Sequence, residues 1–223
     1  MCSEDAIDLA NFLFRPVNFG PSGYSKIDTR NKCVDDLLVF NHFEVLRDIC
    51  TKSGLICSLE HYYKHNKEAR AANYTIFDTT PTTYLVNLGL SDTGLNPFIN
   101  RFKEIAKSNT RKERTPMKHC HENIWLIKPE NANQGRGIEI FKNLKDIQQF
   151  LFSQPLTSGT WVLQKYIEKP LCYKMRKFDI RIWALVTNSF EIYIYKPGYL
   201  RTSSSDYSLH SKDNYVHLTN QCL

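Results

Sequence analysis

A lysine at the end of a strand-like run precedes a glycine-bearing loop in the stretch IKPENANQGRGIEI, residues 127–140. Glycines let a backbone approach a ligand closely and expose N–H groups to phosphate oxygens, and a nearby lysine adds a positive charge. The stretch is interpreted as a grip on a polyphosphate. An ordinary β-turn is the alternative, because the spacing is neither a Walker A loop nor the dinucleotide fingerprint. The residues concerned are Lys128, Gln134, Gly135, Arg136, Gly137 and Ile138.

Alternating charges mark a second stretch, KFDIRIW, at residues 177–183. In a strand with a period of two, Lys177, Asp179 and Arg181 lie on one face. Burying three charges costs free energy unless they serve a purpose. One interpretation is that Lys177 and Arg181 contact phosphate while Asp179 orients them or reaches a metal. A solvent-facing row of ion pairs is equally supported. The opposite face, expected to point into the core, carries Phe178, Ile180 and Ile182.

Two further segments could contact a nucleotide or an acid. VLQKYI, residues 162–167, is a run of strand formers broken by Gln164 and Lys165, and such a strand can present backbone groups to an adenine edge. A plain core strand is the alternative. Arg201 follows what reads as a Lys196-Pro197-Gly198 turn. Its guanidinium fork suits a carboxylate, whereas an ordinary surface arginine is the other interpretation.

Composition limits the class of protein. The 223 residues are enough for one large domain or two small ones, and 42% hydrophobic with 23% charged residues indicates a folded chain. There is no apolar run long enough to span a membrane and no basic region typical of a secretory signal, so no membrane partner is expected. The seven cysteines form no CxxC pair, and their odd number favours a reduced, cytoplasmic protein.

The formal net charge of +6 favours acidic partners, such as nucleic acid, an anionic surface, an acidic peptide or nucleotide phosphate. Much of the positive charge lies in residues 101–118, where a solvated helix face and loop is the simplest explanation. No nucleic-acid-binding signature stands beside it, so nucleic acid is not expected as a partner.

The elements that would position these residues follow from periodicity and turn signals. Residues 1–40 are mixed and rich in loop signals, and the strands that follow alternate with only a few helices, which predicts an α+β fold. A change in composition near residue 122 divides the chain into regions 1–122 and 123–223. The expected helices cover 41–50, 54–74, 96–107 and 144–152, and the expected extended segments cover 79–88, 123–129, 137–141, 160–170, 177–186, 191–201 and 215–223.

Five motifs in one order resemble the tubulin tyrosine ligase-like family, which has an ATP-grasp fold. They are NIWLIKP…NQGRGI, WVLQKYIEKPL, RKFDIRIWALVT, YLRTSS and YVHLTN. The strong resemblance covers residues 123–223, which would be the nucleotide-binding core. A weaker one, NHFEVLRDICTKSGL, resembles the N-terminal region of the family, which would occupy residues 1–122 with a linker.

The resemblance implies that ATP binds between two sheets and activates a carboxylate as an acyl phosphate. The amine of an amino acid then attacks it and forms an amide or isopeptide bond on a tubulin tail. Lys177, Asp179 and Arg181 would be catalytic, and Arg201 would bind the carboxylate of the incoming amino acid. The implied nucleotide site comprises Lys128, Gln134, Gly135, Arg136, Gly137, Ile138, Gln164, Lys165, Tyr166, Ile167, Lys177, Phe178, Asp179, Thr219 and Asn220.

The resemblance also implies partners and a location. The amino acid would be free glutamate or glycine, giving polyglutamylation or glycylation, and plain tyrosine ligation is less expected. The protein partner would be the acidic C-terminal tails of tubulin or microtubules, with the basic segment 101–118 as their dock. The expected location is the cytoplasm and cytoskeleton, including the cilium or basal body.

The chain departs from the family pattern at its end. The family's magnesium ligands are an aspartate and a Glu-x-Asn pair, whereas the carboxylates after Asp179 are Glu191, Asp206 and Asp213, none in that arrangement. We therefore expect the ligands for Mg²⁺ beyond residue 223, in a fold incomplete at its C-terminal end. Residues 1–223 alone are expected to bind ATP weakly without ligating. A non-catalytic relic that binds microtubules or nucleotide is the alternative function.

Overall fold

A computed structural model describes residues 12–13, 39–40, 47–88, 94–110 and 122–219. The contacts divide the chain into two units, Met1–Cys50 and Thr51–Leu223. In the first unit, strand β1 (Phe12–Leu13) pairs in parallel with β2 (Val39–Phe40), and helix α2 covers Arg47–Cys50. The predicted helix at 41–50 is confirmed only for these last four residues, because 41–46 lie outside the described residues.

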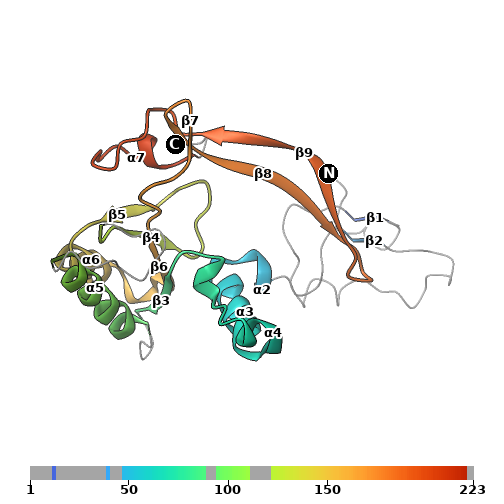
Figure 1. The fold of residues 1–223 in the computed structure, drawn as a ribbon, viewed down its shortest axis with the longest axis horizontal. Coiled ribbons are helices and arrows are strands. Elements are labelled where there is room, and N and C mark those ends of the chain that lie inside the picture. The colour runs from blue at the N-terminus through green and yellow to red at the C-terminus, as the bar shows by residue number, and fades with distance from the viewer. Residues whose placement is uncertain (1–11, 14–38, 41–46, 89–93, 111–121, 220–223) are drawn as a thin grey trace. The chain divides into compact units, whose positions relative to one another are not determined.

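A four-stranded antiparallel sheet forms the centre of the second unit (Figure 1). Its order is β3-β6-β4-β5, so the strand from the middle of the chain, β3, lies beside β6. The sheet thus draws strands from both sides of residue 122, and the division at that position stays a prediction. The strands are β3 (Thr83–Asn87), β4 (Trp125–Pro129), β5 (Glu139–Phe141) and β6 (Thr160–Lys165), which confirms four of the expected extended segments.

Alternation along these strands sends one set of side chains into the core. Helices α5 (Leu95–Thr110) and α6 (Leu144–Ser153) pack against this face, as their helical periodicity predicts. The rings of Phe98 and Trp125 meet edge to face, with centroids 4.9 Å apart. The buried cluster consists of Val86, Phe98, Phe102, Ile105, Trp125, Ile127, Ile147, Leu151, Trp161 and Leu163. The opposite face of the sheet is left for the candidate site.

Side-chain caps divide the predicted helical stretch after residue 51. Helix α3 (Lys52–His65) begins at Thr51, whose hydroxyl accepts a hydrogen bond from the Gly54 amide at 3.0 Å. Asn66 ends α3, and its side chain accepts from the Ala69 amide to begin α4 (Lys67–Ala71). Short 3-10 helices follow at Ile76–Asp78 and Leu156–Ser158. None of the helices in the described residues is long and apolar enough to cross a membrane.

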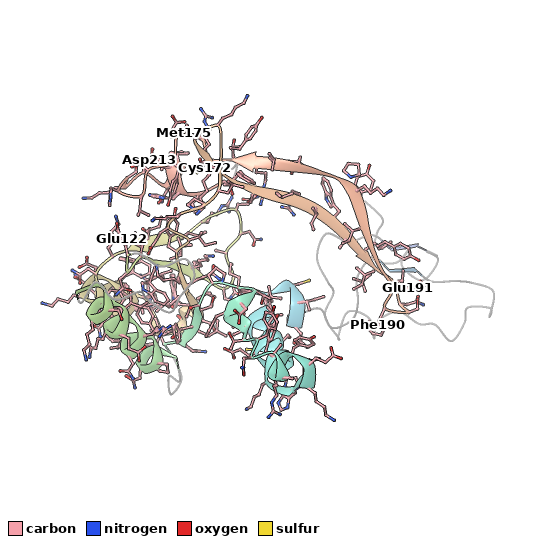
Figure 2. The ribbon with its side chains drawn as sticks, viewed as in Figure 1. Glu122, Cys172, Met175, Phe190, Glu191 and Asp213 are labelled. Carbon is pink, nitrogen blue, oxygen red and sulfur yellow. The ribbon has the colours of Figure 1, made fainter. Side chains whose placement is uncertain are left out.

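The second sheet of this unit has three strands, in the order β7-β8-β9, and two of them form a long ribbon (Figure 1). Strand β8 (Arg176–Val186) pairs antiparallel with β9 (Ile192–Thr202), and β7 (Cys172–Tyr173) pairs with the start of β8. Figure 2 shows Phe190 and Glu191 at the tip of the ribbon and Cys172 and Met175 at its other end. The two antiparallel strands predicted from the alternating pattern are confirmed.

The predicted turn at Lys196-Pro197-Gly198 is wrong. These three residues lie inside β9, where Trp183 pairs with Tyr195 and Arg181 pairs with Tyr199, so three residues of β9 oppose one of β8. This is an irregularity of the bulge type, at which a strand tolerates proline and glycine. A Cβ at Gly198 would lie 2.9 Å from the backbone oxygen of Arg181, so the close approach of the strands favours glycine there.

The expected burial of Ile180 and Ile182 is also wrong, since their side chains are 62% and 54% exposed. A strand buries its apolar face only when a second layer covers it. In the part of the chain that the structure describes, no layer covers this face of the ribbon, and the alternating pattern could not reveal that.

The last expected extended segment, 215–223, is wrong for residues 215–217. Asn214–His217 form a single helical turn, α7, whose N-cap is Asp213 (labelled in Figure 2). The Asp213 carboxylate accepts from the Tyr215 amide at 2.9 Å, which satisfies one of the free donors at the helix start. This local cap outweighs the strand propensity of Tyr215 and Val216, and it turns His217 inward.

Candidate nucleotide site

A row of polar side chains crosses the sheet on the face opposite α5 and α6. Lys128 Nζ on β4 donates to Gln164 Oε1 on β6 at 2.6 Å, and Gln164 Nε2 donates to Thr83 Oγ1 on β3 at 3.0 Å. Thr83 and Gln164 are direct partners in the register, and Lys128 lies diagonally across from Gln164. The sheet thus positions Lys128 and Gln164 together, as the sequence-based interpretation requires. Thr83 was not anticipated.

Lys177, near the start of β8, is a second part-buried amine. Its Nζ lies 4.2 Å from the centroid of the Tyr166 ring, a cation–π contact. Burial, and then the charge of Lys128, lower the pKa of Lys177 to about 8. Burial, and then the charge of Lys52, lower the pKa of Lys128 to about 8. Positive charges held close together and partly out of water are stabilised by an anion that arrives between them.

The glycine-bearing loop consists of two successive tight turns between β4 and β5. The Arg136 amide donates to the Asn133 oxygen at 3.1 Å, and the Ile138 amide donates to the Gly135 oxygen at 3.3 Å. Gln134, Gly135 and Gly137 have positive φ values of 60°, 82° and 68°. Only glycine adopts this region readily, so the two glycines are required by the backbone whichever ligand the loop contacts. Arg136 is exposed on the loop.

The end of β6 places its residues on opposite sides. Gln164 points to the row of polar side chains, whereas Lys165 points the other way and forms a buried ion pair with Glu168. The amides of Lys165 and Tyr166 donate to the oxygens of Thr82 and Ile124. The Lys165 amine therefore belongs to an internal contact rather than to the face that carries Lys128. Ile167, which follows Tyr166 directly after the strand, has a side chain that is 38% exposed.

A buried tyrosine–histidine pair links this strand to α7. The Tyr166 hydroxyl lies 2.8 Å from His217 Nδ1, and His217 Nε2 lies 2.9 Å from the Ser211 backbone oxygen. A carbonyl oxygen only accepts, so Nε2 carries the proton and Nδ1 accepts from the tyrosine. Burial raises the pKa of Tyr166 and lowers that of His217, so both groups stay neutral near pH 7.

Asp179 lies where three segments meet. As a direct partner of Arg201 across the ribbon, it accepts from Arg201 Nε and Nη2, both at 2.7 Å. Thr219 Oγ1 donates to the same carboxylate at 2.7 Å. Burial alone would raise the pKa of Asp179, but the bonds from Arg201 and Thr219 outweigh it, so the pKa is lowered. Arg201 thus binds a carboxylate of this chain, and its remaining N–H groups can face another.

The other predicted site residues are placed less centrally. Phe178 is half-buried and Arg181 is exposed, although the charge of Arg181 also lowers the pKa of Asp179. Asn220 lies outside the described residues, as do the last residues of the basic segment from 111 onward. The described residues contain no group of three or more His, Cys, Asp or Glu side chains that could hold a metal ion. They therefore do not fit Mg²⁺ by themselves.

Sequence reasoning missed four residues that the structure brings to this region: Lys52, Thr83, Glu168 and His217. Glu168 and His217 carried a usable signal, because both lie inside the motifs WVLQKYIEKPL and YVHLTN. Lys52 lies inside the weaker motif NHFEVLRDICTKSGL, but nothing in that motif distinguishes it from its neighbours. Thr83 lies in none of the motifs and carried no signal.

Comparison with known proteins shows which family the chain is similar to. A profile of the tubulin-tyrosine ligase family matches residues 32–223. Tubulin glycylase 3A of Drosophila melanogaster is 42% identical over 105 residues, which are 46% of this chain and 11% of that protein. Tubulin glycylase 3C of Tetrahymena thermophila is 45% identical over 102 residues, 44% of this chain and 9% of that protein. Human tubulin monoglycylase TTLL3 is 40% identical over 105 residues, which are 45% of this chain and 14% of that protein. The matched stretch thus spans about a tenth of each relative's length.

Proposed function

The chain belongs to the tubulin-tyrosine ligase family, and from this premise we propose that it serves an ATP-dependent ligase that joins glycine to tubulin. The expected α+β, ATP-grasp-like fold is confirmed by the family match. The observations that support the proposal are two part-buried amines: Lys128, which donates to Gln164, and Lys177, which lies over the Tyr166 ring. The charge of Lys128 acts on Lys177, and the pKa of each is lowered to about 8.

ATP would supply the phosphoryl group that turns a carboxylate of tubulin into an acyl phosphate, which the amine of the amino acid attacks with release of phosphate. The two lysines would neutralise the phosphate charge, and Gln164 would hold the Lys128 amine in place. Positioning and charge neutralisation account for most of the catalysis in phosphoryl transfer. Ile167 offers an exposed apolar side chain, and we propose that it covers the adenine ring together with the backbone of Gln164 to Tyr166.

Arg201 would bind the carboxylate of the incoming amino acid. Its bidentate pair with Asp179 fixes the orientation of the guanidinium plane, and Thr219 fixes Asp179 in turn. The donors of Arg201 that Asp179 does not use would then bind the second carboxylate. Arg181, which faces Tyr199 across the ribbon, would add positive charge nearby.

We propose glycine rather than glutamate as the transferred residue, because the relatives named above are glycylases. The test supplies ATP, tubulin and radiolabelled glycine to the full-length protein, with labelled glutamate in a parallel reaction. The proposal predicts that glycine, and not glutamate, is incorporated into tubulin in a reaction that depends on ATP. Incorporation of glutamate would overturn the choice of amino acid, and incorporation of neither would favour the nucleotide-binding relic.

The acidic tails of tubulin would meet the basic face of α5. Lys103 and Lys107 are exposed on this helix, while Arg101 is paired with Glu104 at 2.9 Å. A positive helix face attracts an acidic, flexible peptide through its summed charge, and the attraction weakens with added salt. This partner places the protein on the microtubule cytoskeleton of the cytoplasm. The cilium or basal body stays a prediction.

Nucleotide binding is expected to weaken as the pH rises through 8. Below pH 8 both lysines are protonated and attract phosphate, and above it they lose their protons, because their pKa values lie near 8 rather than 10.5. Tyr166 and His217 stay neutral throughout this range. The affinity for ATP should fall at least about tenfold between pH 7.5 and 9.5. Calorimetric titration measures this, with adenosine as the control. An unchanged ATP affinity would contradict the assignment of the two lysines.

A further inference from the structure

We propose that Lys52 is a positioning residue that fixes the stem of the glycine-bearing loop for binding of a polyphosphate. The inference rests on the proposed nucleotide site and adds to it a residue from a separate element. Lys52 is the first residue of α3, far from the loop in sequence. Its side chain reaches the point where β4 ends and the loop begins.

The contact uses the full donor capacity of the side chain. Lys52 Nζ donates to the backbone oxygens of Pro129 at 2.9 Å, Glu130 at 2.9 Å and Ala132 at 2.7 Å. An ammonium group has three donors, so one amine gathers three carbonyl groups that lie within four residues. The adjacent Ser53 hydroxyl donates to the Glu130 carboxylate, which ties a second residue of α3 to the same stem.

This geometry differs from that of an ordinary surface lysine, whose amine moves freely in water. Fixing a long side chain costs conformational entropy, which several charge-assisted hydrogen bonds can offset. The bonds from Lys52 end at Ala132, and the two turns within the loop begin at Asn133. The stem is therefore held by α3 and the tip by its own hydrogen bonds. Together they fix the direction of the loop relative to Lys128.

Lys52 also acts on the charge of the site. Burial lowers the pKa of Lys52, and the nearby Glu130 counteracts part of this effect. The charge of Lys52 in turn lowers the pKa of Lys128. Removing Lys52 would therefore leave Lys128 more readily protonated, which by itself favours phosphate binding. A loss of affinity on removal of Lys52 would then report the position of the loop rather than charge alone.

Limited trypsin digestion of Lys52→Met tests the structural step without using nucleotide. Arg136 is an exposed cleavage site inside the loop, and Lys145 on α6 is an exposed reference site. Loss of the stem contacts should speed cleavage after Arg136 about tenfold, because cleavage reports local opening. Cleavage after Lys145 should stay unchanged. Lys64→Met, an exposed lysine in the last turn of the same helix, is the matched control. Equal cleavage after Arg136 in wild type and Lys52→Met overturns the proposal.

Nucleotide binding tests the functional step. Lys52→Met should lower the affinity for ATP about tenfold, while the affinity for AMP, which lacks the β- and γ-phosphates, should stay the same. An equal loss for both nucleotides would mean general damage and would overturn the positioning role. Lys52→Arg keeps the charge but replaces the compact amine by a planar fork, so it should not restore affinity or loop protection. Full rescue of ATP binding by arginine would also overturn the proposal. Failure of the wild-type protein to bind ATP would overturn the proposed nucleotide site instead.

Discussion

Replacing either Lys128 or Lys177 by alanine in the full-length protein should abolish nucleotide binding, with a loss of affinity of at least about 30-fold at pH 7. Both lysines are part-buried and the charge of Lys128 acts on Lys177, so each amine would contact phosphate partly shielded from bulk water. Removing one partner of such a buried charge contact costs about 2–5 kcal/mol. That range is enough to reduce an ordinary ATP affinity below detection.

The same substitutions should leave the fold intact. Burial makes both charges unfavourable in the free protein, as the lowered pKa values show. Lys128→Ala removes that penalty together with the hydrogen bond to Gln164. These effects oppose each other, so we expect little change in the melting temperature. Between pH 8 and 10.5 the unfolded chain binds protons at these lysines that the folded protein does not bind. The wild type should therefore gain stability as the pH rises from 8 towards 10.5, and each alanine variant should lack its part of that gain.

Calorimetric titration with ATP, combined with thermal unfolding, measures both effects. Lys145→Ala is the matched control, because Lys145 is exposed on α6 and distant in sequence from both amines. It should bind ATP like the wild type. Unchanged nucleotide affinity in both Lys128→Ala and Lys177→Ala would show that the site is assigned to the wrong residues.

Breaking the buried ion pair between Lys165 and Glu168 should have the largest effect on stability. The Lys165 side chain is 3% exposed and the Glu168 side chain is fully buried. The Glu168 carboxylate also accepts from the amides of Glu122 at 2.6 Å and Ile124 at 3.4 Å. Lys165 Nζ donates to the Ile124 oxygen at 2.9 Å. The pair therefore joins the end of β6 to the start of β4 at the point where the predicted adenine strand leaves the sheet.

Removal of one charged partner leaves the other buried without compensation, which costs about 3–5 kcal/mol. We expect a loss of that size in the free energy of unfolding for Glu168→Ala and for Lys165→Met. The double substitution should lose less than the sum of the two, because it buries no isolated charge. Urea denaturation of the four proteins in the cycle measures the coupling.

The exposed pair of Arg101 and Glu104 on α5 is the matched control for this cycle. Its side chains are 27% and 63% exposed, so its loss should cost at most about 0.5 kcal/mol. If the Lys165 and Glu168 substitutions cost no more than these, the pair does not hold the end of β6, and the strand must be fixed by its backbone ladder alone.

Local patterns predicted the elements of the fold well where a repeating period continued for a full element. The apolar run in NIWLIKP and the strand formers in TWVLQK predicted β4 and β6, and LKDIQQFLF was correctly predicted as the helix α6. The errors arose where a single residue or a missing layer decides the outcome. Pro197 and Gly198 read as a turn, yet a bulge accommodates them within β9. Ile180 and Ile182 alternate like core residues, yet no described layer covers them.

The site was predictable to the extent that its residues occur within ordered motifs. Lys128 and Gln164 lie far apart in sequence, and the motifs indicated that they meet, as their hydrogen bond shows. The direction of Lys165 could have been inferred as well, because a period of two places it opposite Gln164. The roles of Lys52 and Thr83 could not have been inferred from the sequence. Their contacts depend on how α3 and β3 pack beside β4 and β6, and no local pattern encodes this long-range pairing.

The most direct test of the central claim is covalent labelling with an acyl-phosphate derivative of ATP. A lysine amine beside the bound phosphates attacks the acyl carbon of this probe, keeps the acyl group and releases ATP. Amines with a pKa of about 8 are partly neutral at pH 8 and therefore react readily. Mass spectrometry of the digested protein should find the label on Lys128 or Lys177, and excess ATP present during the labelling should prevent it. Label spread over exposed lysines such as Lys142 and Lys145, undiminished by ATP, would contradict the claim that this face of the sheet binds the nucleotide.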